Sequence, residues 1–298
     1  MSSKIWGAIA LAGLVVFGLG TGEAFGYEQT MTCDESGPYA CDPGQTPMAV
    51  HWNTRCVDYE MSQKGSQNII DESKGSVELE DLRDEVRRSF AAWTAVDCSD
   101  MTLVDGGLSD VQKSSTESVE NSDDTNLVIW RDDSWSDVAS ANAFALTSVT
   151  FNPESGVIVD ADIEFNTEMY DYSITDEPPS NHVDLRNTMT HEAGHFIGLD
   201  HTDVTEATMF ATAPLGETDK RNLHHDDIEG ICRTYPSTNA SHADCDGFYG
   251  FPEDGQDDYD SERGCASGGG GLPGSASLIL VTLMGSILAS RKRRRSGA

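Results

Sequence analysis

Apolar residues recur at helical spacing between positions 77 and 96. They are Val77, Leu79, Leu82, Val86, Phe90, Ala91 and Trp93. Positions three and four apart share one face of a helix, so this pattern predicts an amphipathic helix with one buried side. Acidic residues come early in the segment, and Arg87 and Arg88 come late, an order that the helix dipole favours.

Shorter apolar runs on both sides of this helix predict strands. The strands are 48–61, 101–104, 126–131, and a pair, 145–151 and 157–165, that alternates apolar and polar residues around a turn at 152–156. Gly, Ser, Asp and Glu dominate residues 105–125, which predicts a loop. A second helix is expected from about Val183, and a third late in the segment. The order of elements predicts one α+β domain over residues 48–236.

The N-terminal residues have the three parts of a secretory signal peptide. Lys4 precedes an apolar run, 5–19, and Ala24 and Gly26 stand at the −3 and −1 positions of a cut before Tyr27. Residues 1–26 are therefore predicted to be a signal peptide, and 27–47, which are polar with Pro and Gly, a short N-terminal extension. The protein is expected to be exported.

The C-terminal residues predict a surface attachment. An acidic and Gly-rich linker, 237–271, leads to 272–298, an apolar span with a basic tail that is long enough to cross a bilayer. With Cys265 before the glycines, the arrangement resembles the tripartite sorting signals of bacterial surface proteins, in the cysteine-containing form of myxobacteria. In that form the tail is cut and the protein is moved to the cell surface. The alternative is a permanent C-terminal transmembrane helix.

Charge and cysteine content agree with export. The net charge is −32 and the pI about 4.3, so the surface repels nucleic acid, and no nucleic-acid partner is expected. Seven cysteines in an exported chain indicate disulfides. By proximity along the chain we expect the pairs Cys33–Cys41, Cys56–Cys98 and Cys232–Cys245, which leaves Cys265 over. A monomer is expected.

The candidate chemistry lies in the segment from His191 to His201. His191 and His195 are four apart and project from one face of a helix, where they can share a zinc ion. Gly198 can adopt a left-handed conformation that ends the helix, so that His201 returns as a third ligand. Three protein ligands leave a position for water, as in a catalytic zinc site, and Glu192 stands beside the metal as the general base. The pattern predicts a zinc-dependent endopeptidase.

This extended motif resembles that of the metzincin metallopeptidases, and Gly198 to His201 is most similar to the matrixins. The segments 207–210, 226–235 and 160–166 resemble the Met-turn, the C-terminal helix and the last sheet strand of that family. The resemblance implies a twisted mixed sheet with three helices, and Met209 as an apolar floor beneath the ligands. It also implies that a protein or peptide substrate pairs with an edge strand near Ala145–Thr150.

The resemblance has limits that leave alternatives open. No His lies between His51 and His182, so the second zinc site of many animal matrixins is not expected. Structural calcium is implied by the family, with oxygens from the turns near Asp132-Asp133 and Asp160–Glu168, and the alternative is that these acids only form a solvated acidic surface. A catalytically weak surface-binding module is the main alternative function. Another class of zinc peptidase, with Glu217 in place of His201 as the third ligand, is a further one.

Overall fold

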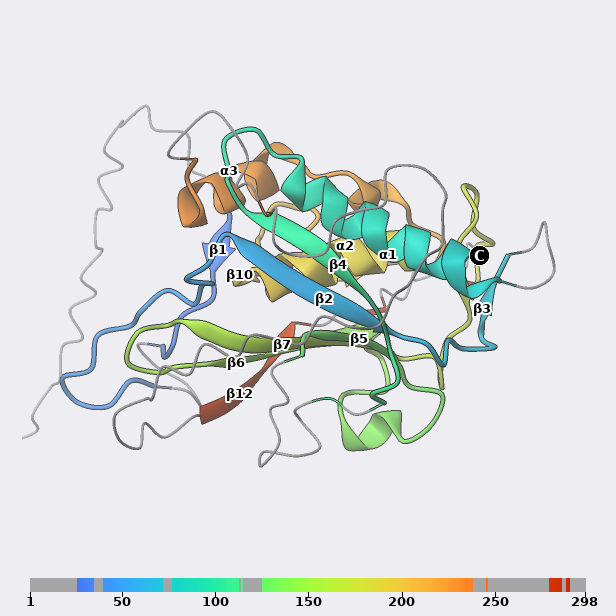
Figure 1. Ribbon diagram of the computed structural model, residues 1–298, viewed down its shortest axis with the longest axis horizontal. Helices are drawn as coiled ribbons and strands as arrows, with labels where there is room; N and C mark the ends of the chain where they lie inside the picture. Colours follow the sequence, from blue (N-terminus) through green and yellow to red (C-terminus); the bar gives the residue numbers. More distant parts are fainter. Residues whose placement is uncertain are drawn as a thin grey trace, which may run out of the picture.

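The core of the domain is a twisted mixed sheet with helices against it (Figure 1). The computed structural model describes residues 26–34, 40–71, 77–112, 114, 125–237 and 245, and the backbone of 279–285 and 288–289. The strand order is β12-β6-β7-β5-β2-β4. The bounds of these strands are β2 Cys56–Ser62, β4 Thr102–Ser109, β5 Leu127–Trp130, β6 Ala145–Phe151, β7 Ile158–Phe165 and β12 Ile279–Gly285.

Four of these strands are parallel, and β6 is antiparallel to β7. The predicted strand pair at 145–151 and 157–165 is confirmed, with Thr147 opposite Ile163. Every residue of β5 and β6 is buried, which agrees with the apolar sequence of β5 and means that the polar residues of β6, among them Thr147, are buried as well. The predicted α+β class, with a mixed sheet and three helices, is therefore confirmed in the described part of the chain.

Two predicted strand boundaries are wrong. The first strand begins at Cys56 and not at residue 48, because residues 53–55 bend the chain before the sheet begins. The strand predicted at 101–104 continues to Ser109, within the expected loop. There Gly107 has a φ of 106°, and the register of β4 against β2 shifts at the same place. A bulge formed by glycine carries the pairing on where the composition indicated a loop.

Three α-helices lie on the same side of the sheet (Figure 1). The first is α1 (Leu79–Thr94), whose stripe of Leu82, Val86, Phe90 and Trp93 is buried as the periodicity predicted. Phe90 stacks on Tyr59 of the sheet and meets Phe196 edge to face. Because Phe196 belongs to α2 (Leu185–Phe196), these aromatic contacts join the sheet and the first two helices. The third helix is α3 (His225–Thr234).

Short elements complete the described structure. They are β1 Glu28–Gln29, β3 Ile69–Ile70, η2 Trp135–Asp137, β8 Tyr172–Ser173, β9 Val183–Asp184, β10 Leu199–Asp200, β11 Thr212–Ala213, η3 Asp219–Arg221 and β13 Leu288–Ala289. Strand β1 pairs with β10, so the segment predicted as an N-terminal extension contacts the chain just before His201. Among the described residues, no helix has the length and apolar character needed to cross a membrane.

Strand β6 was expected to be a free edge strand of the sheet, but its outer edge is paired with another segment of the chain. Strand β12, from the segment predicted to be a membrane span or sorting signal, pairs antiparallel with β6, and β13 pairs parallel with β11. The unpaired N–H and C=O groups of an edge strand accept any extended segment that reaches them, which is the physical reason for the difference. Most of the segment 272–298, the signal peptide up to residue 25, and all of the linker 237–271 except residues 237 and 245 lie outside the described residues.

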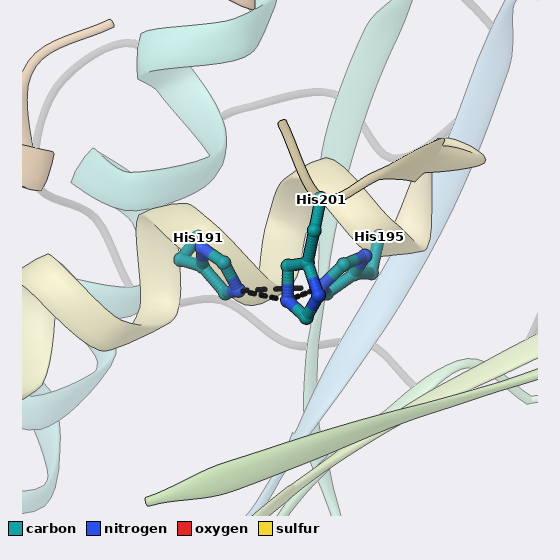
Figure 2. A group of neighbouring side chains, drawn as sticks. All are labelled: His191, His195 and His201. Carbon is teal, nitrogen blue, oxygen red and sulfur yellow. Dashed lines mark hydrogen bonds between the residues drawn. The ribbon is translucent and has the colours of Figure 1, made fainter. Parts of the chain in front are cut away.

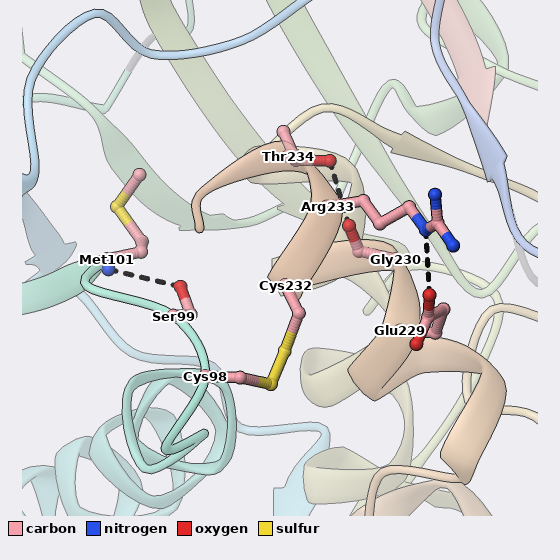
Figure 3. Close-up of a disulfide and its surroundings, with 8 residues drawn as sticks. All are labelled: Cys98, Ser99, Met101, Glu229, Gly230, Cys232, Arg233 and Thr234. Atoms are coloured by element: carbon pink, nitrogen blue, oxygen red, sulfur yellow. Dashed lines mark hydrogen bonds and ion pairs between the residues drawn. A yellow bond between two sulfur atoms is a disulfide. The ribbon is translucent and has the colours of Figure 1, made fainter. Parts of the chain in front are cut away.

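One predicted disulfide is confirmed and two are wrong. Cys33 bonds to Cys41 as expected, whereas Cys56 bonds to Cys245 and Cys98 to Cys232. Cys98 follows the end of α1 and Cys232 lies on α3, and the fold brings these two elements together (Figure 3). Proximity along the chain fails here because partners 134 and 189 residues apart are brought together only by the tertiary structure.

Candidate metal centre

Helix α2 carries two of the three candidate ligands, and side chains from other elements fix both of its ends. The carboxylate of Asp184 accepts a hydrogen bond from the backbone N–H of Asn187 at 2.7 Å and so caps the N-terminus. At the other end, Trp52 Nε1 donates to the carbonyl of Phe196 and the Tyr235 hydroxyl to that of Ile197. Carbonyls without a partner inside the helix are thereby satisfied, and the helix ends in a defined place.

Gly198 turns the chain back toward the helix. Its φ is 88°, and a Cβ atom there would lie 2.3 Å from the carbonyl oxygen of Val50, so no other residue fits. The reversal brings His201 beside the two histidines of α2 (Figure 2). Gly194, between those two histidines, lets Met209 approach closely, since an added Cβ would lie 2.2 Å from Met209 Sδ and would displace that side chain. Met209 is thus packed against the ligand-bearing turn of α2, where the resemblance to the family places it.

The three imidazoles point their Nε2 atoms at a common centre (Figure 2). The distances between the Nε2 atoms are 3.2 Å for His191 and His195, and 3.3 Å from each of them to His201. His191 Nδ1 donates to the carbonyl of Thr208 at 2.6 Å, and His195 Nδ1 donates to that of Leu199 at 2.8 Å. These bonds place the proton on Nδ1, so that the Nε2 lone pairs of both residues face the centre.

Burial keeps these imidazoles neutral. It lowers the pKa of His191 well below the ordinary value, that of His195 to about 4 and that of His201 to about 3. Neutral imidazole is the form that binds a metal ion. Because His191 and His195 hold their protons on Nδ1, their Nε2 atoms cannot donate to each other, and both are free to bind a shared ion.

The donor set fits a zinc ion. Zinc binds imidazole nitrogen at about 2.0–2.1 Å in tetrahedral geometry, which sets ligand nitrogens about 3.3 Å apart, close to the separations found here. Among the described residues, this trio is the group of His, Cys, Asp or Glu side chains that converges on one point. Glu217, the alternative third ligand, lies instead 3.7 Å from Lys220 Nζ and does not join the trio.

Glu192 is completely buried beside the trio. Its carboxylate Oε2 accepts a hydrogen bond from the hydroxyl of Thr147 on β6 at 2.7 Å. The sequence placed Glu192 next to the metal but did not indicate Thr147. Only the packing of α2 on β6 brings the two residues together, and a Thr in a strand is ordinary.

Asp227 on α3 is a second residue that the sequence did not single out. Its carboxylate accepts backbone N–H groups from Thr208 at 2.8 Å, Met209 at 2.9 Å and His224 at 2.7 Å. Since the carbonyl of Thr208 accepts the proton of His191 Nδ1, this carboxylate positions the turn that orients a ligand. The bond to His224 also completes the capping box of α3. The sequence indicates this capping role of Asp227, because an acid stands three residues after the cap residue.

The fold and the site define a class before any comparison. The features of a metalloprotease are all present. They are a helix with two histidines four apart, a third histidine after a glycine turn, an adjacent glutamate and a mixed sheet. The sequence model of the matrixin family matches residues 52–236. The chain belongs to the matrixin family, which implies zinc as the metal.

Curated plant relatives are similar to parts of the chain. Metalloendoproteinase 2-MMP of Arabidopsis thaliana is 37% identical over 78 residues, which are 22% of this chain and 20% of the plant protein. Metalloendoproteinase 1 of Glycine max is 39% identical over 62 residues, 21% of this chain and 20% of that protein. Metalloendoproteinase 1-MMP of Arabidopsis thaliana is 23% identical over 193 residues, 62% and 44% of the two chains. The chain thus spans about a fifth of the length of the first two relatives.

Proposed function

We propose that this protein is an exported zinc-dependent endopeptidase that hydrolyses peptide bonds of extracellular proteins. The observation that carries the proposal is the convergence of three imidazole Nε2 atoms 3.2–3.3 Å apart beside the buried carboxylate of Glu192. The family and the names of the plant relatives support peptide-bond hydrolysis. The three disulfides support export, since such bonds persist in oxidising compartments.

His191, His195 and His201 would hold the ion. Zinc bound there supplies a Lewis acid that acidifies a water molecule and polarises the carbonyl of the substrate. Glu192 takes the proton of the attacking water on its carboxylate and passes it to the nitrogen of the leaving amine. The burial of Glu192 excludes bulk water from this proton transfer.

The substrate would lie extended along β6, in the place that β12 takes in this structure. An extended segment of this chain, β12, already pairs with that strand in the antiparallel direction, which supports the fit of a peptide there. Attachment to the cell surface through 272–298 and structural calcium remain parts of the proposal that rest on the sequence. Of the acids considered for calcium, Asp132 accepts hydrogen bonds from Ser66 and Thr167.

A surface-binding module is the alternative that the experiment has to exclude. The chain is loaded with zinc and incubated with denatured casein, with and without a chelator, beside Glu192→Ala. We expect cleavage that the chelator abolishes and that Glu192→Ala lowers by about 10²–10⁴-fold, the usual contribution of a general base. A folded, zinc-loaded protein that leaves casein intact would favour the binding module.

The ligand set has a separate test. His201→Ala should release the zinc that the wild-type protein retains through dialysis, measured as the metal-to-protein ratio. The matched control is Glu217→Ala, which changes the alternative ligand. Zinc retained by His201→Ala and lost by Glu217→Ala would show that the third ligand is Glu217.

A further inference from the structure

Thr147 lies where a sheet residue can act on the general base. It stands at the third position of β6, on which α2 packs, and its side chain is completely buried. Its hydroxyl is 2.7 Å from Glu192 Oε2 and 3.2 Å from the backbone carbonyl of the same residue. The hydroxyl has one proton to give, and the shorter contact, to a carboxylate, is the stronger because it is charge-assisted.

The direction of this bond follows from the chemistry of the partners. An ionised carboxylate only accepts, so Thr147 donates and Glu192 receives. The terminal torsion of a glutamate side chain is broad when nothing holds it. A hydrogen bond on one oxygen fixes that torsion, and it thereby fixes the direction in which the second oxygen points.

A second buried hydroxyl nearby does not serve the same purpose. Burial raises the pKa of Tyr172, and the charge of Glu192 adds to this effect. The Tyr172 hydroxyl, however, donates its proton to the backbone carbonyl of Phe144. Of these two hydroxyls, the one hydrogen bonded to Glu192 is that of Thr147.

We propose that Thr147 is a positioning residue that holds the carboxylate of Glu192 in the orientation from which it takes a proton from water. The inference rests on the proposed peptidase function and deepens it. In this account the hydroxyl of Thr147 contacts Glu192 and not the metal or the scissile bond, and only the backbone of β6 would pair with a substrate. The hydroxyl acts through Glu192, so its loss should lower the rate of the chemical step and leave substrate binding intact.

Three substitutions in the full-length, zinc-loaded chain test this. Thr147→Val keeps the shape and removes the hydroxyl, and Thr147→Ser keeps the hydroxyl. Thr102→Val is the matched control, because the Thr102 hydroxyl, on β4, has no hydrogen-bond partner among the described residues. The substrate is a quenched-fluorescence peptide taken from a site that the wild-type protein cuts in denatured casein.

Thr147→Val should lower kcat at least about tenfold, with KM within about twofold and the zinc content unchanged. Thr147→Ser should restore kcat to within about threefold of wild type, and Thr102→Val should leave it unchanged. If the wild type is active and Thr147→Val is equally active, the positioning role is wrong. The same holds if Thr147→Ser is as slow as Thr147→Val, and neither result contradicts the peptidase function. A wild type without zinc-dependent cleavage overturns the peptidase function and this inference with it.

A measurement without activity gives an independent readout. Urea unfolding is followed in the presence of a chelator for wild type, Thr147→Val, Glu192→Ala and the double variant. If the hydroxyl is bonded to the carboxylate, the drop in urea midpoint caused by Thr147→Val should shrink by at least half in the Glu192→Ala background. Equal drops in both backgrounds would show that the hydroxyl and the carboxylate do not interact.

Discussion

The carboxylate of Asp227 connects two parts of the site that are distant in sequence. It lies on α3 and holds the backbone of Thr208 and Met209, which pack beneath the ligand-bearing turn of α2. Burial raises the pKa of this carboxyl, while its three backbone N–H donors oppose that rise. Removal of the carboxylate would leave the buried N–H groups of Thr208 and Met209 without this acceptor.

Asp227→Ala should destabilise the protein by about 2–4 kcal/mol, because several buried donors lose their acceptor. It should also weaken zinc binding, because Thr208 then no longer fixes the proton of His191. Urea unfolding and competition with a zinc-binding dye measure the two effects. Asp219→Ala, at an exposed position of η3, is the control. If Asp227→Ala destabilised the protein but left the zinc affinity unchanged, Asp227 would stabilise the fold without orienting the imidazole of His191.

Some site residues are positioned by contacts that are local in the sequence, and others by contacts between distant segments. His191, Glu192, His195 and His201 could be predicted because their spacing within eleven residues determines where they point on a helix and a turn. The contact of Thr147 with Glu192, and those of Asp227 with Thr208 and Met209, could not be predicted, because the partners lie 45 and 18–19 residues away in sequence. No local pattern marks a hydroxyl or a carboxylate whose function depends on the packing of two elements.

At the scale of elements, Asp184 joins the catalytic helix to the segment that follows the Met-turn. It caps α2, and its two oxygens accept hydrogen bonds from Nε and Nη2 of Arg221 at 2.8 and 2.5 Å. The side chain of Arg221 is 12% exposed and that of Asp184 is 0% exposed. Arg221 also donates to the carbonyls of Thr175 and Asp176, so one guanidinium holds three segments together.

Arg221→Met should lower the free energy of unfolding by about 2–3 kcal/mol, because it leaves the buried carboxylate of Asp184 without its charged partner. The control is Arg233→Met, whose ion pair with Glu229 is on the surface, where solvent screens it, so a much smaller loss is expected. Urea unfolding of both variants measures the difference. If Arg221→Met and Arg233→Met lost the same free energy of unfolding, the Asp184–Arg221 pair would stabilise the protein no more than a surface ion pair does.

Long periodic elements were predictable and short ones were not. The stripe of α1 and the alternation of β6 and β7 extend over seven or more residues, enough to establish a period. Strands such as β3, β8 and β9 have two residues each, and their pairing depends only on the segments that lie beside them. The continuation of β4 past residue 104 was missed because glycines at a bulge have the composition of a loop.

At the scale of the whole molecule, the disulfides join distant parts of the domain. Cys98–Cys232 ties the end of α1 to α3 (Figure 3). Cys56–Cys245 joins β2 to residue 245, so the closed loop that it forms contains Cys98 and Cys232. Cys33–Cys41 closes a separation of only 8 residues near the N-terminus of the described chain. A long closed loop restricts the unfolded chain more than a short one, so the three bonds contribute unequally to stability.

The comparison of two double variants tests this. Loop-closure entropy predicts that the bond between Cys33 and Cys41 stabilises the folded protein by about 2.5 kcal/mol. For Cys98–Cys232 it predicts about 4 kcal/mol, because the Cys56–Cys245 bond already shortens the loop that Cys98–Cys232 closes. Replacing Cys98 and Cys232 by Ser should therefore destabilise the protein by at least about 1 kcal/mol more than replacing Cys33 and Cys41. Cys98 is exposed whereas Cys33 is buried, so lost packing would act in the opposite direction. A larger loss of the unfolding free energy in the Cys33 and Cys41 variant, measured in urea, would show that local packing outweighs the restriction of the unfolded chain.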